Sequence, residues 1–403
     1  MTDQVTNHVT ATFRADRLVV GGDAMARDAD GRVVFIAGAL PGDVVTATVT
    51  VRKKGYSRAE LDDVVEPGPD RVDPPCPAVA AGCGGCTFQH ASVAAQRRLK
   101  VEIIRDALRR QGGITDPPLE ATVELPDRGY RTTVRVLVRD GRPAFRRRHG
   151  HDAVPVPDGG CLVTHSDLDA LLREGDFTGA SEVQLRVGAR TGERLAVIHP
   201  DASRVVIPAD VTVIDSQGIA AGRHAHFHEE AGGRRWQIDA RAFFQARADG
   251  ADALVDLARD ATGSARSVLD LYGGVGLLGG CVAATTGAAL TVVEGNPGAV
   301  HSARRNLADL DARIVHEDVR NHRPTHHDLV IADPSRAGLA APGVGVVVAA
   351  EPDRVVLVSC DAAALGRDAR LLTEAGFWLR SVTPVDLFPH TVHVEVVSVF
   401  DRR

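Results

Sequence analysis

The sequence predicts an α/β protein with a doubly wound sheet at its C-terminal end, preceded by a small β-barrel and a central β-rich domain. From about residue 240, strand patterns alternate with helix patterns, which is typical of a doubly wound sheet. The first segment instead contains short strands separated by turns, as in a small all-β module. A stiff Pro/Gly linker at 67–75 then leads into a cysteine-rich run at 76–86. We therefore expect domains at 1–66, 67–239 and 240–403.

Composition indicates an ordinary globular protein. The 403 residues suffice for two or three domains, and 44% are hydrophobic and 25% charged. No apolar run is long enough to span a membrane. The sequence from Met1 to Gln4 and beyond is polar and lacks the apolar core of a signal peptide. We expect a cytoplasmic monomer with no membrane partner. The net charge of -6 argues against a nucleic-acid partner, but residues 128–148 hold eight arginines and one acid.

In the first domain, residues 33–36 lead through a turn at 40–43 to an alternating strand at 44–51. The basic turn that follows contains Lys53, Lys54 and the aromatic Tyr56, as suits an RNA-binding barrel. A solvated hairpin tip would have the same composition, and this segment alone does not separate the two interpretations.

The cysteines are not spaced like a disulfide framework, and a cytoplasmic chain keeps its thiols reduced. Cys76, Cys83 and Cys86 are crowded together, and Cys161 follows at a distance. The two glycines before Cys86 allow the backbone to fold back, so that neighbouring sulfurs face one centre. Four thiolates suit tetrahedral zinc or a cubane iron–sulfur cluster, and the spacing does not decide which. Unrelated buried thiols are the less favoured alternative.

A helix is predicted from Ser92, which caps it, to about Gln111, with Leu99, Ile103 and Leu108 facing inward. The opposite surface is expected to be basic. Its residues are Arg97, Arg98, Lys100, Arg105, Arg109 and Arg110.

A strand is predicted from Tyr130 to a hairpin turn at Asp140-Gly141. A two-residue period places Arg131, Arg135 and Arg139 on one face and the valines at 134, 136 and 138 on the other. Such a row of guanidinium groups suits phosphate binding, with a merely solvated face as the alternative.

His224, His226 and His228 would lie on one side of a strand, which suggests a metal site. Only Glu229 and Glu230 accompany them, so an exposed hairpin edge is the favoured interpretation.

The first strand of the doubly wound sheet, at 267–271, runs into residues 270–279, DLYGGVGLLG. A match to the dinucleotide fingerprint is weak by itself. However, Asp270 lies at the end of this strand. Glu294 ends the next strand, where its carboxylate can accept hydrogen bonds from both ribose hydroxyls of one nucleoside. With Gly274 and Gly276 letting the chain pass under the ligand, this loop looks like that of class I methyltransferases that use S-adenosylmethionine.

Further strands are expected at 290–293, 329–332, 355–358 and 393–400. Asp333 follows the strand at 329–332 and begins a DPSR motif, and Cys360 lies at the end of the strand at 355–358. The carboxyl ends of parallel strands are where such sheets present their chemistry, so Cys360 is placed to act as a nucleophile beside the cofactor.

Taken with the motifs FFQ at 243–245, SCDAAALGRD at 359–368 and DLFPHTVHVE at 386–395, the chain resembles the bacterial RNA uracil-C5 methyltransferases over nearly its full length. The resemblance implies a class I methyltransferase sheet, an N-terminal TRAM-type barrel of the OB kind, S-adenosylmethionine as cofactor, and an RNA substrate. Large-subunit ribosomal RNA is the first choice of substrate and transfer RNA the second.

The resemblance also assigns residues to roles. Cys360 matches the family nucleophile and Glu395 the base. Gln245, Asp270, Tyr272, Gly274, Gly276, Glu294 and Asp333 match positions in the cofactor site. Cys76, Cys83, Cys86 and Cys161 match the ligands of a [4Fe–4S] cluster, and Arg131, Arg135, Arg139, Lys53 and Lys54 are expected to contact RNA. Cys281 has no match and is expected to be a buried core thiol.

Two positions depart from the family pattern. Ser335 stands where the family has the second proline of Asp-Pro-Pro-Arg, and Asp361-Ala362 replaces the usual Asn-Pro. The acid beside Cys360 would by itself disfavour the thiolate.

Two other functions fit parts of the sequence. A radical-forming adenosylmethionine enzyme would need a tighter three-cysteine signature within an eight-stranded barrel. A non-catalytic RNA-binding or chaperone protein on a methyltransferase scaffold is the remaining alternative, and intact Cys360 and Glu395 argue against it.

Overall fold

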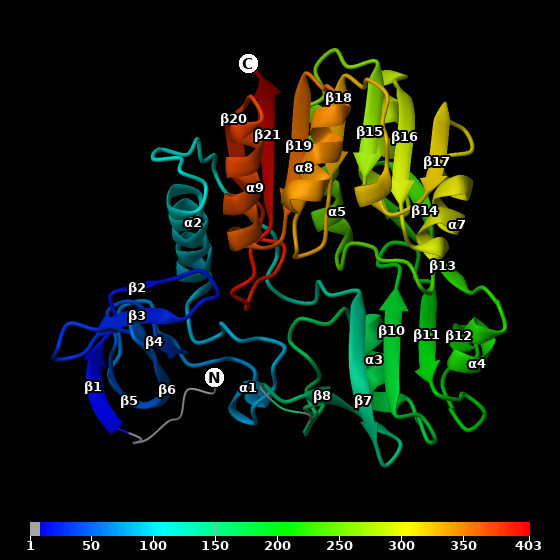
Figure 1. The fold of residues 1–403 in the computed structure, drawn as a ribbon. Coiled ribbons are helices and arrows are strands. Elements are labelled where there is room, and N and C mark those ends of the chain that lie inside the picture. Colours follow the sequence, from blue (N-terminus) through cyan, green and yellow to red (C-terminus); the bar gives the residue numbers. More distant parts are fainter. Residues whose placement is uncertain (1–8, 149, 151) are drawn as a thin grey trace.

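The computed structural model describes residues 9–148, 150 and 152–403, so Met1 to Gln4 lie outside the described part. Figure 1 shows the N-terminal strands at the lower left, a second sheet at the lower right, and the large C-terminal sheet above them. Within the described ranges, no helix has both the length and the apolarity needed to cross a membrane.

The N-terminal strands form the predicted small β module. The six strands are β1 (Val9–Arg14), β2 (Arg17–Leu18), β3 (Ala24–Arg27), β4 (Val33–Ala37), β5 (Val44–Arg52) and β6 (Tyr56–Glu66), in the order β1-β5-β6-β4-β3-β2. Val34, Ile36 and Val45 alternate with more exposed neighbours and are fully buried. The buried Asp43 carboxylate accepts hydrogen bonds from the Gly68 amide (2.7 Å) and the Arg71 side chain (2.6 Å), which ties the module to the following linker.

The middle of the chain forms a second six-stranded sheet. Its strands are β7 (Thr133–Arg139), β8 (Arg142–Arg146), β9 (Ala153–Pro155), β10 (Glu182–Val187), β11 (Arg194–His199) and β12 (Val211–Asp215), in the order β12-β11-β10-β7-β8-β9. The short helices α1 (Pro77–Ala80), α3 (Ser166–Glu174) and α4 (Ser216–Ala220) accompany it. Asp140 (φ 50°) and Gly141 (φ 75°) form the predicted two-residue hairpin turn between β7 and β8.

A separate hairpin, β13 (His226–Ala231) with β14 (Arg234–Asp239), carries His226 and His228, whereas His224 precedes β13 and does not lie on the expected strand. The Nδ1 atom of His224 lies 2.8 Å from Asp239, and that of His228 lies 2.9 Å from Glu193. These two imidazoles thus contact carboxylates of the protein itself.

The C-terminal half is the predicted doubly wound sheet. Its strands are β15 (Ser267–Leu271), β16 (Ala289–Glu294), β17 (Ala312–His316), β18 (Leu329–Ala332), β19 (Arg354–Ser359), β20 (Phe377–Pro384) and β21 (Val396–Arg402), and its helices are α5 (Ala248–Asp260), α6 (Leu277–Thr286), α7 (Pro297–Asn306), α8 (Ala340–Ala349) and α9 (Ala362–Glu374). The strand order is β17-β16-β15-β18-β19-β21-β20, with β21 antiparallel to both of its neighbours. The expected strands are all present, but the last begins at Val396 rather than 393, and the sequence analysis did not identify β17 or β20.

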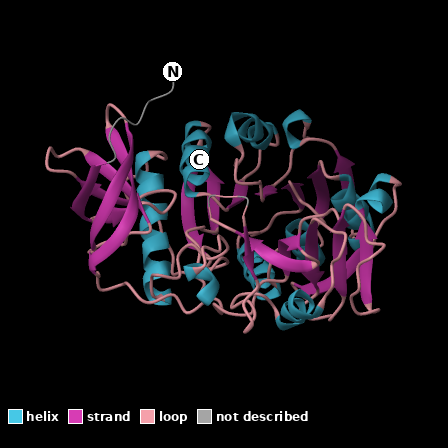
Figure 2. Cartoon of the chain, turned by 90° about the horizontal axis from the view of Figure 1, so that it is seen from below, coloured by secondary structure: helices cyan, strands magenta, loops and turns pink. Residues whose placement is uncertain are grey.

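Helices cover both faces of this sheet, as seen from below in Figure 2. On β15, Leu269 and Leu271 belong to the same buried cluster as residues of α8 and α9, whereas Val268 belongs to the cluster that contains α5 and α6. This division follows from the two-residue period of a strand, and it explains why the central strands are apolar throughout.

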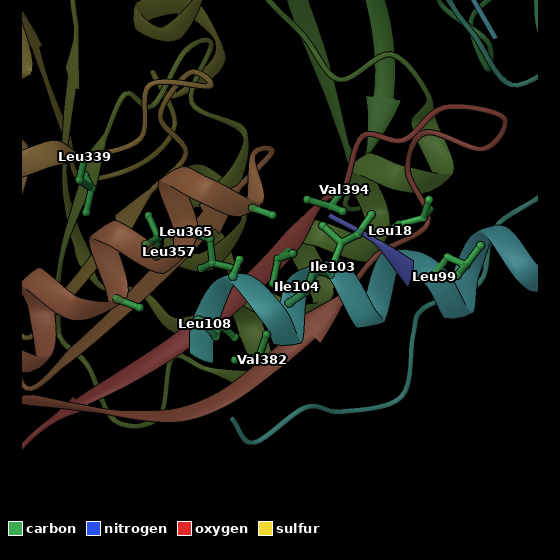
Figure 3. Packing of buried hydrophobic residues seen from close by; sticks show 14 of the residues in the cluster. Leu18, Leu99, Ile103, Ile104, Leu108, Leu339, Leu357, Leu365, Val382 and Val394 are labelled. Carbon is green, nitrogen blue, oxygen red and sulfur yellow. The ribbon is translucent and has the colours of Figure 1, made fainter. Parts of the chain in front are cut away.

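Helix α2 (Val93–Arg110) joins the central segment to the large sheet. Ser92 caps it by accepting a hydrogen bond from Ala95, and Leu99, Ile103 and Leu108 are buried as predicted. Figure 3 shows α2 lying across β20, β21 and α9, with its apolar residues directed at Val382 and Val394.

The expectation that the other surface of α2 is uniformly basic is wrong at Lys100. This residue is 5% exposed, and its ammonium donates to Asp386 at 3.0 Å. A buried charge requires a partner of opposite sign, and only the fold shows that Asp386 supplies it.

Candidate active site

Cys360 lies between β19 and α9, at the carboxyl edge of the parallel strands. The neighbouring Asp361 caps α9 by accepting a hydrogen bond from the Ala364 amide at 2.8 Å. Burial, together with the Glu395 and Asp333 carboxylates, raises the pKa of Cys360 to about 11, although the Arg336 guanidinium acts to lower it. The acids that act most on this thiol are therefore Glu395 and Asp333, not the adjacent Asp361 that the sequence analysis singled out.

Glu395 immediately precedes β21 and is 4% exposed. Because β21 is inserted next to β19, the start of β21 pairs with the end of β19, with Val396 opposite Ser359. This pairing brings Glu395 to Cys360 from 35 residues away in the chain. Burial, with a further contribution from Asp333, raises the pKa of Glu395 well above its usual value.

Asp333 follows β18, and Gln245 lies in the segment before α5. The Gln245 amide nitrogen donates to Asp333 at 3.1 Å. Burial also raises the pKa of Asp333, because a carboxylate removed from water loses its solvation. Burial thus raises the pKa of both neighbouring acids, Asp333 and Glu395, above that of an exposed carboxyl group.

The glycine loop is built around two carboxylates. Asp270, at the end of β15, accepts a hydrogen bond from the Gly279 amide at 3.0 Å, and a Cβ at Gly279 would lie 2.7 Å from this carboxylate oxygen. The second Asp270 oxygen is buried without a partner, and burial raises the pKa of Asp270 to about 7. Glu294, at the end of β16, accepts hydrogen bonds from the amides of Gly274 (2.9 Å) and Asn296 (2.6 Å).

A cavity of ≈ 580 Å³, called here the Cys360 pocket, brings the expected groups together. It is lined by seven of the predicted site residues: Gln245, Tyr272, Gly274, Glu294, Asp333, Cys360 and Glu395. Asp270 lines a small adjoining pocket with Tyr272 and Gly274. Gly276 lines neither; its φ is 93°, and a Cβ there would lie 2.6 Å from Leu307, so packing requires this glycine.

The structure adds lining residues that the sequence analysis did not assign. They are Phe243, Asn296, Ala299, Pro334, Ser335, Arg336, Phe388 and His393 in the Cys360 pocket. Asp318, Val319 and Arg320 line a further hollow beside Tyr272 and Glu294. They follow β17, a partly exposed edge strand, so recognising that strand would have revealed them.

The four clustered cysteines line a second cavity, of ≈ 520 Å³, called here the cysteine cavity. Burial, with a smaller contribution from nearby thiols, raises the pKa of Cys83 and raises that of Cys86 to about 12. Across the described ranges, no three His, Cys, Asp or Glu side chains form a group that could hold a metal ion. The four thiols nevertheless share the walls of one cavity. Cys281 is fully buried elsewhere, as expected.

The three arginines of the expected row differ in exposure. Arg135 and Arg139 lie exposed on β7, with Val134, Val136 and Val138 buried. Arg131 precedes the strand and has a buried Nε atom without a hydrogen-bond partner, and both Arg131 and Arg135 line the cysteine cavity. Lys53 and Lys54 lie at the tip of the β5–β6 hairpin, where the Arg32 guanidinium donates to the Lys53 carbonyl at 2.5 Å.

The doubly wound sheet, the glycine loop and the Cys360 pocket define a class I methyltransferase joined to a small β domain. Two family models agree: a methyltransferase small domain matches residues 239–341, and a TRAM domain matches residues 16–61.

Full-length relatives specify the family. An uncharacterized RNA methyltransferase of Streptomyces avermitilis is 33% identical, with 94% of this chain and 95% of the relative covered. The 23S rRNA (uracil(1939)-C(5))-methyltransferase RlmD of Halomonas elongata is 31% identical, with 94% and 87% covered. The chain belongs to the bacterial RNA uracil-C5 methyltransferase family.

A solved structure has the same fold. It is the tRNA (uracil-54, C5)-methyltransferase of Pyrococcus abyssi in complex with S-adenosyl-L-homocysteine, with a TM-score of 0.72 and 22% identity, covering 96% of this chain and 100% of that one.

Proposed function

We propose that this RNA methyltransferase moves a methyl group from S-adenosylmethionine to C5 of a uridine through a covalent bond between Cys360 and C6. The observation that carries the proposal is that Cys360 and Glu395 share one pocket with Glu294 and the glycine loop. A nucleophile, a base and a nucleoside-binding carboxylate thereby line a single cavity.

The chemistry explains why these residue types are needed. Uracil C5 is too weakly nucleophilic to take a methyl group directly, so the Cys360 thiolate first adds to C6 and pushes the electrons of the C5–C6 double bond towards C5. C5 then attacks the sulfonium methyl, and the sulfur–methyl bond breaks. Glu395 removes the C5 proton, the double bond re-forms, and the bond from Cys360 to C6 breaks. The uridine must be flipped out of its stack to reach this pocket.

The cofactor contacts follow from the loop geometry. The Glu294 carboxylate would accept hydrogen bonds from the ribose hydroxyls. Gly274, which has no side chain, leaves room for the methionine portion near Gln245 and Asp333. The hollow beside Asp318 and Val319 suits the purine ring. S-adenosylmethionine supplies the electrophilic methyl group.

The experiment that tests this function is mass-spectrometric mapping of 5-methyluridine in RNA from a strain that lacks the gene. Loss of one site in large-subunit ribosomal RNA is the expected result, because the Halomonas relative is named for that substrate and is similar along 94% of this chain. Loss of a site in transfer RNA would assign the second candidate substrate.

We also propose that Cys76, Cys83, Cys86 and Cys161 hold a [4Fe–4S] cluster. The support is the donor set, four thiols on the walls of one cavity of ≈ 520 Å³. A single zinc ion needs sulfur ligands at about 2.3 Å around one point. The part of the chain that the structure describes contains no group of three or more His, Cys, Asp or Glu side chains placed to hold a metal ion, so the proposal rests on the four thiols around one cavity.

Cys86→Ser is expected to remove the brown colour of anaerobically purified protein and to lower its solubility, because losing a closing metal centre unfolds the segment around it. Cys281→Ser should keep the colour. Elemental analysis that finds stoichiometric zinc without iron would contradict the cluster and leave the methyl-transfer proposal standing.

RNA binding is proposed for the exposed arginines of β7. Replacing Arg135 and Arg139 by Gln is expected to reduce the log–log salt slope of RNA binding by up to about two units, because each phosphate contact releases counterions. Affinity for S-adenosylmethionine should not change. A wild-type salt slope would show that these side chains are only solvated.

Replacing two charged neighbours of Cys360, Glu395 and Arg336, should shift the pKa of its thiol in opposite directions. A thiol with a pKa of about 11 is mostly protonated at neutral pH, so alkylation of Cys360 by iodoacetamide should rise about tenfold per pH unit between pH 8 and 10. Glu395→Gln removes a charge that raises this pKa and should speed alkylation at fixed pH. Arg336→Gln removes a charge that lowers it and should slow alkylation. Peptide mass spectrometry measures both rates, and shifts of equal sign would contradict the assigned electrostatics.

A further inference from the structure

The loop between β20 and β21, residues 385–395, forms a wall of two cavities. Phe388, His393 and Glu395 line the Cys360 pocket. Val392 and His393 line the cysteine cavity. The segment that carries the proposed base therefore also borders the four thiols.

This loop is held by residues outside it. The Tyr130 hydroxyl donates to the Pro389 carbonyl at 3.1 Å, and the Phe88 amide donates to the His390 carbonyl at 2.9 Å. The His390 amide in turn donates to the Gln96 side chain at 2.7 Å. His390 has a φ of 63°, a left-handed conformation that costs free energy in a residue other than glycine. The external hydrogen bonds offset that cost and select this conformation.

A buried ion pair fixes the start of the same loop. The Lys100 ammonium donates to the Asp386 carboxylate at 3.0 Å and to the Phe388 carbonyl at 2.9 Å. Arg97 donates to the other Asp386 oxygen at 2.9 Å. Val394, at the far end, packs against α2 beside Ile103 (Figure 3). Helix α2 thus contacts both ends of the loop.

The residues that hold the loop are continuous with the cysteine cavity. Tyr130 packs with Cys86 and Val163 in one buried cluster, and Phe88 follows Cys86 by two residues. The Cys76 amide donates to the Gln89 side chain at 3.1 Å. A change in the packing of the thiols would therefore displace Tyr130 and Phe88. Because these two residues are hydrogen-bonded to Pro389 and His390, the loop would shift with them.

We propose that the cysteine segment positions the general base: Tyr130 and Phe88 are positioning residues that hold the 385–395 loop so that Glu395 reaches the C5 proton. This inference rests on the proposed role of Glu395. It gives the cysteine site a function in the second half of the reaction, proton removal and release of Cys360. Cofactor binding and thiol attack use the glycine loop and β19, which these contacts do not touch.

Tyr130→Phe tests the proposal by removing one hydroxyl while keeping the buried ring. RNA with tritium at uridine C5 reports proton removal, and a denaturing gel reports the covalent protein–RNA adduct. Tritium release is expected to slow about tenfold or more, because small misplacements of a catalytic group have large effects on rate. The adduct should accumulate, and the Kd for S-adenosylmethionine should stay unchanged. Thr262→Val is the matched control, because it removes a buried hydroxyl that donates to the Ala258 carbonyl at 2.9 Å outside both cavities, and it should behave like wild type.

Hydrogen exchange provides a second readout, independent of turnover. Amides of residues 386–395 should exchange about tenfold faster in Tyr130→Phe and in Cys86→Ser, whereas a peptide covering 267–279 should keep its protection. Unchanged exchange in the loop, or wild-type tritium release by Tyr130→Phe while Glu395→Gln still accumulates adduct, would overturn the inference. If Glu395→Gln turns over normally, the base assignment itself fails, and the exchange result then decides whether the cysteine segment still holds the loop.

Discussion

Cys360→Ala is expected to lower methyl transfer by more than about 10⁵-fold, because without the thiolate the C5 nucleophile never forms. The variant should bind RNA and S-adenosylmethionine as wild type does, since the side chain lost is small and half-buried. It should give neither product nor a covalent adduct on a denaturing gel. This outcome also excludes a protein that only binds RNA on a methyltransferase scaffold, because such a protein would lose nothing with this thiol.

Cys281→Ala is the matched control for Cys360→Ala. Cys281 is fully buried in α6 and outside the Cys360 pocket, so its loss should reduce stability slightly and leave methyl transfer intact. RNA containing 5-fluorouridine should trap the wild-type enzyme and the Cys281→Ala variant equally, because fluorine cannot leave as a proton. Normal turnover by Cys360→Ala would refute the covalent mechanism.

Glu395→Gln is expected to separate attack from release. The amide cannot accept the C5 proton, so turnover should fall by about 10² to 10⁴-fold, the usual contribution of a general base. Attack and methylation should still occur, and the protein–RNA adduct should therefore accumulate as a slowly migrating band. Removing this carboxylate also lowers the pKa of Cys360, which favours formation of the thiolate that attacks.

Glu395→Asp is the conservative variant to compare. It keeps the carboxylate but shortens its reach, so it should recover part of the turnover that Glu395→Gln loses. A fully active Glu395→Gln would move the base to another residue, and Asp333, which lines the same pocket with a raised pKa, would be tested next.

Much of the fold was predictable because its signals are local. The cap at Ser92, the turn at Asp140-Gly141 and the apolar strands of the large sheet each depend on residues a few positions apart. The edge strand β17 was missed because its residues are partly exposed, so it lacks the continuous apolar run of its neighbours.

Several features of the site were not predictable in this way. Lys100 and Arg131 were expected on exposed basic surfaces, yet Lys100 is paired with Asp386 and Arg131 lines the cysteine cavity. Nothing in the local sequence distinguishes them from Arg98, which is half exposed. The partner of a buried charge is set by long-range packing, and periodicity does not contain that information.

The sequence by itself determined the order of strands and loops, and with it the placement of Asp270, Glu294, Asp333 and Cys360 at strand ends. In a parallel sheet the carboxyl ends of the strands share one edge, so these positions follow from chain order. Only the tertiary structure decided that Glu395 meets Cys360, because this depends on β21 inserting antiparallel between β19 and β20. It also decided that the loop before β21 separates the Cys360 pocket from the cysteine cavity, since that contact is made by segments about 300 residues apart, which only packing brings together.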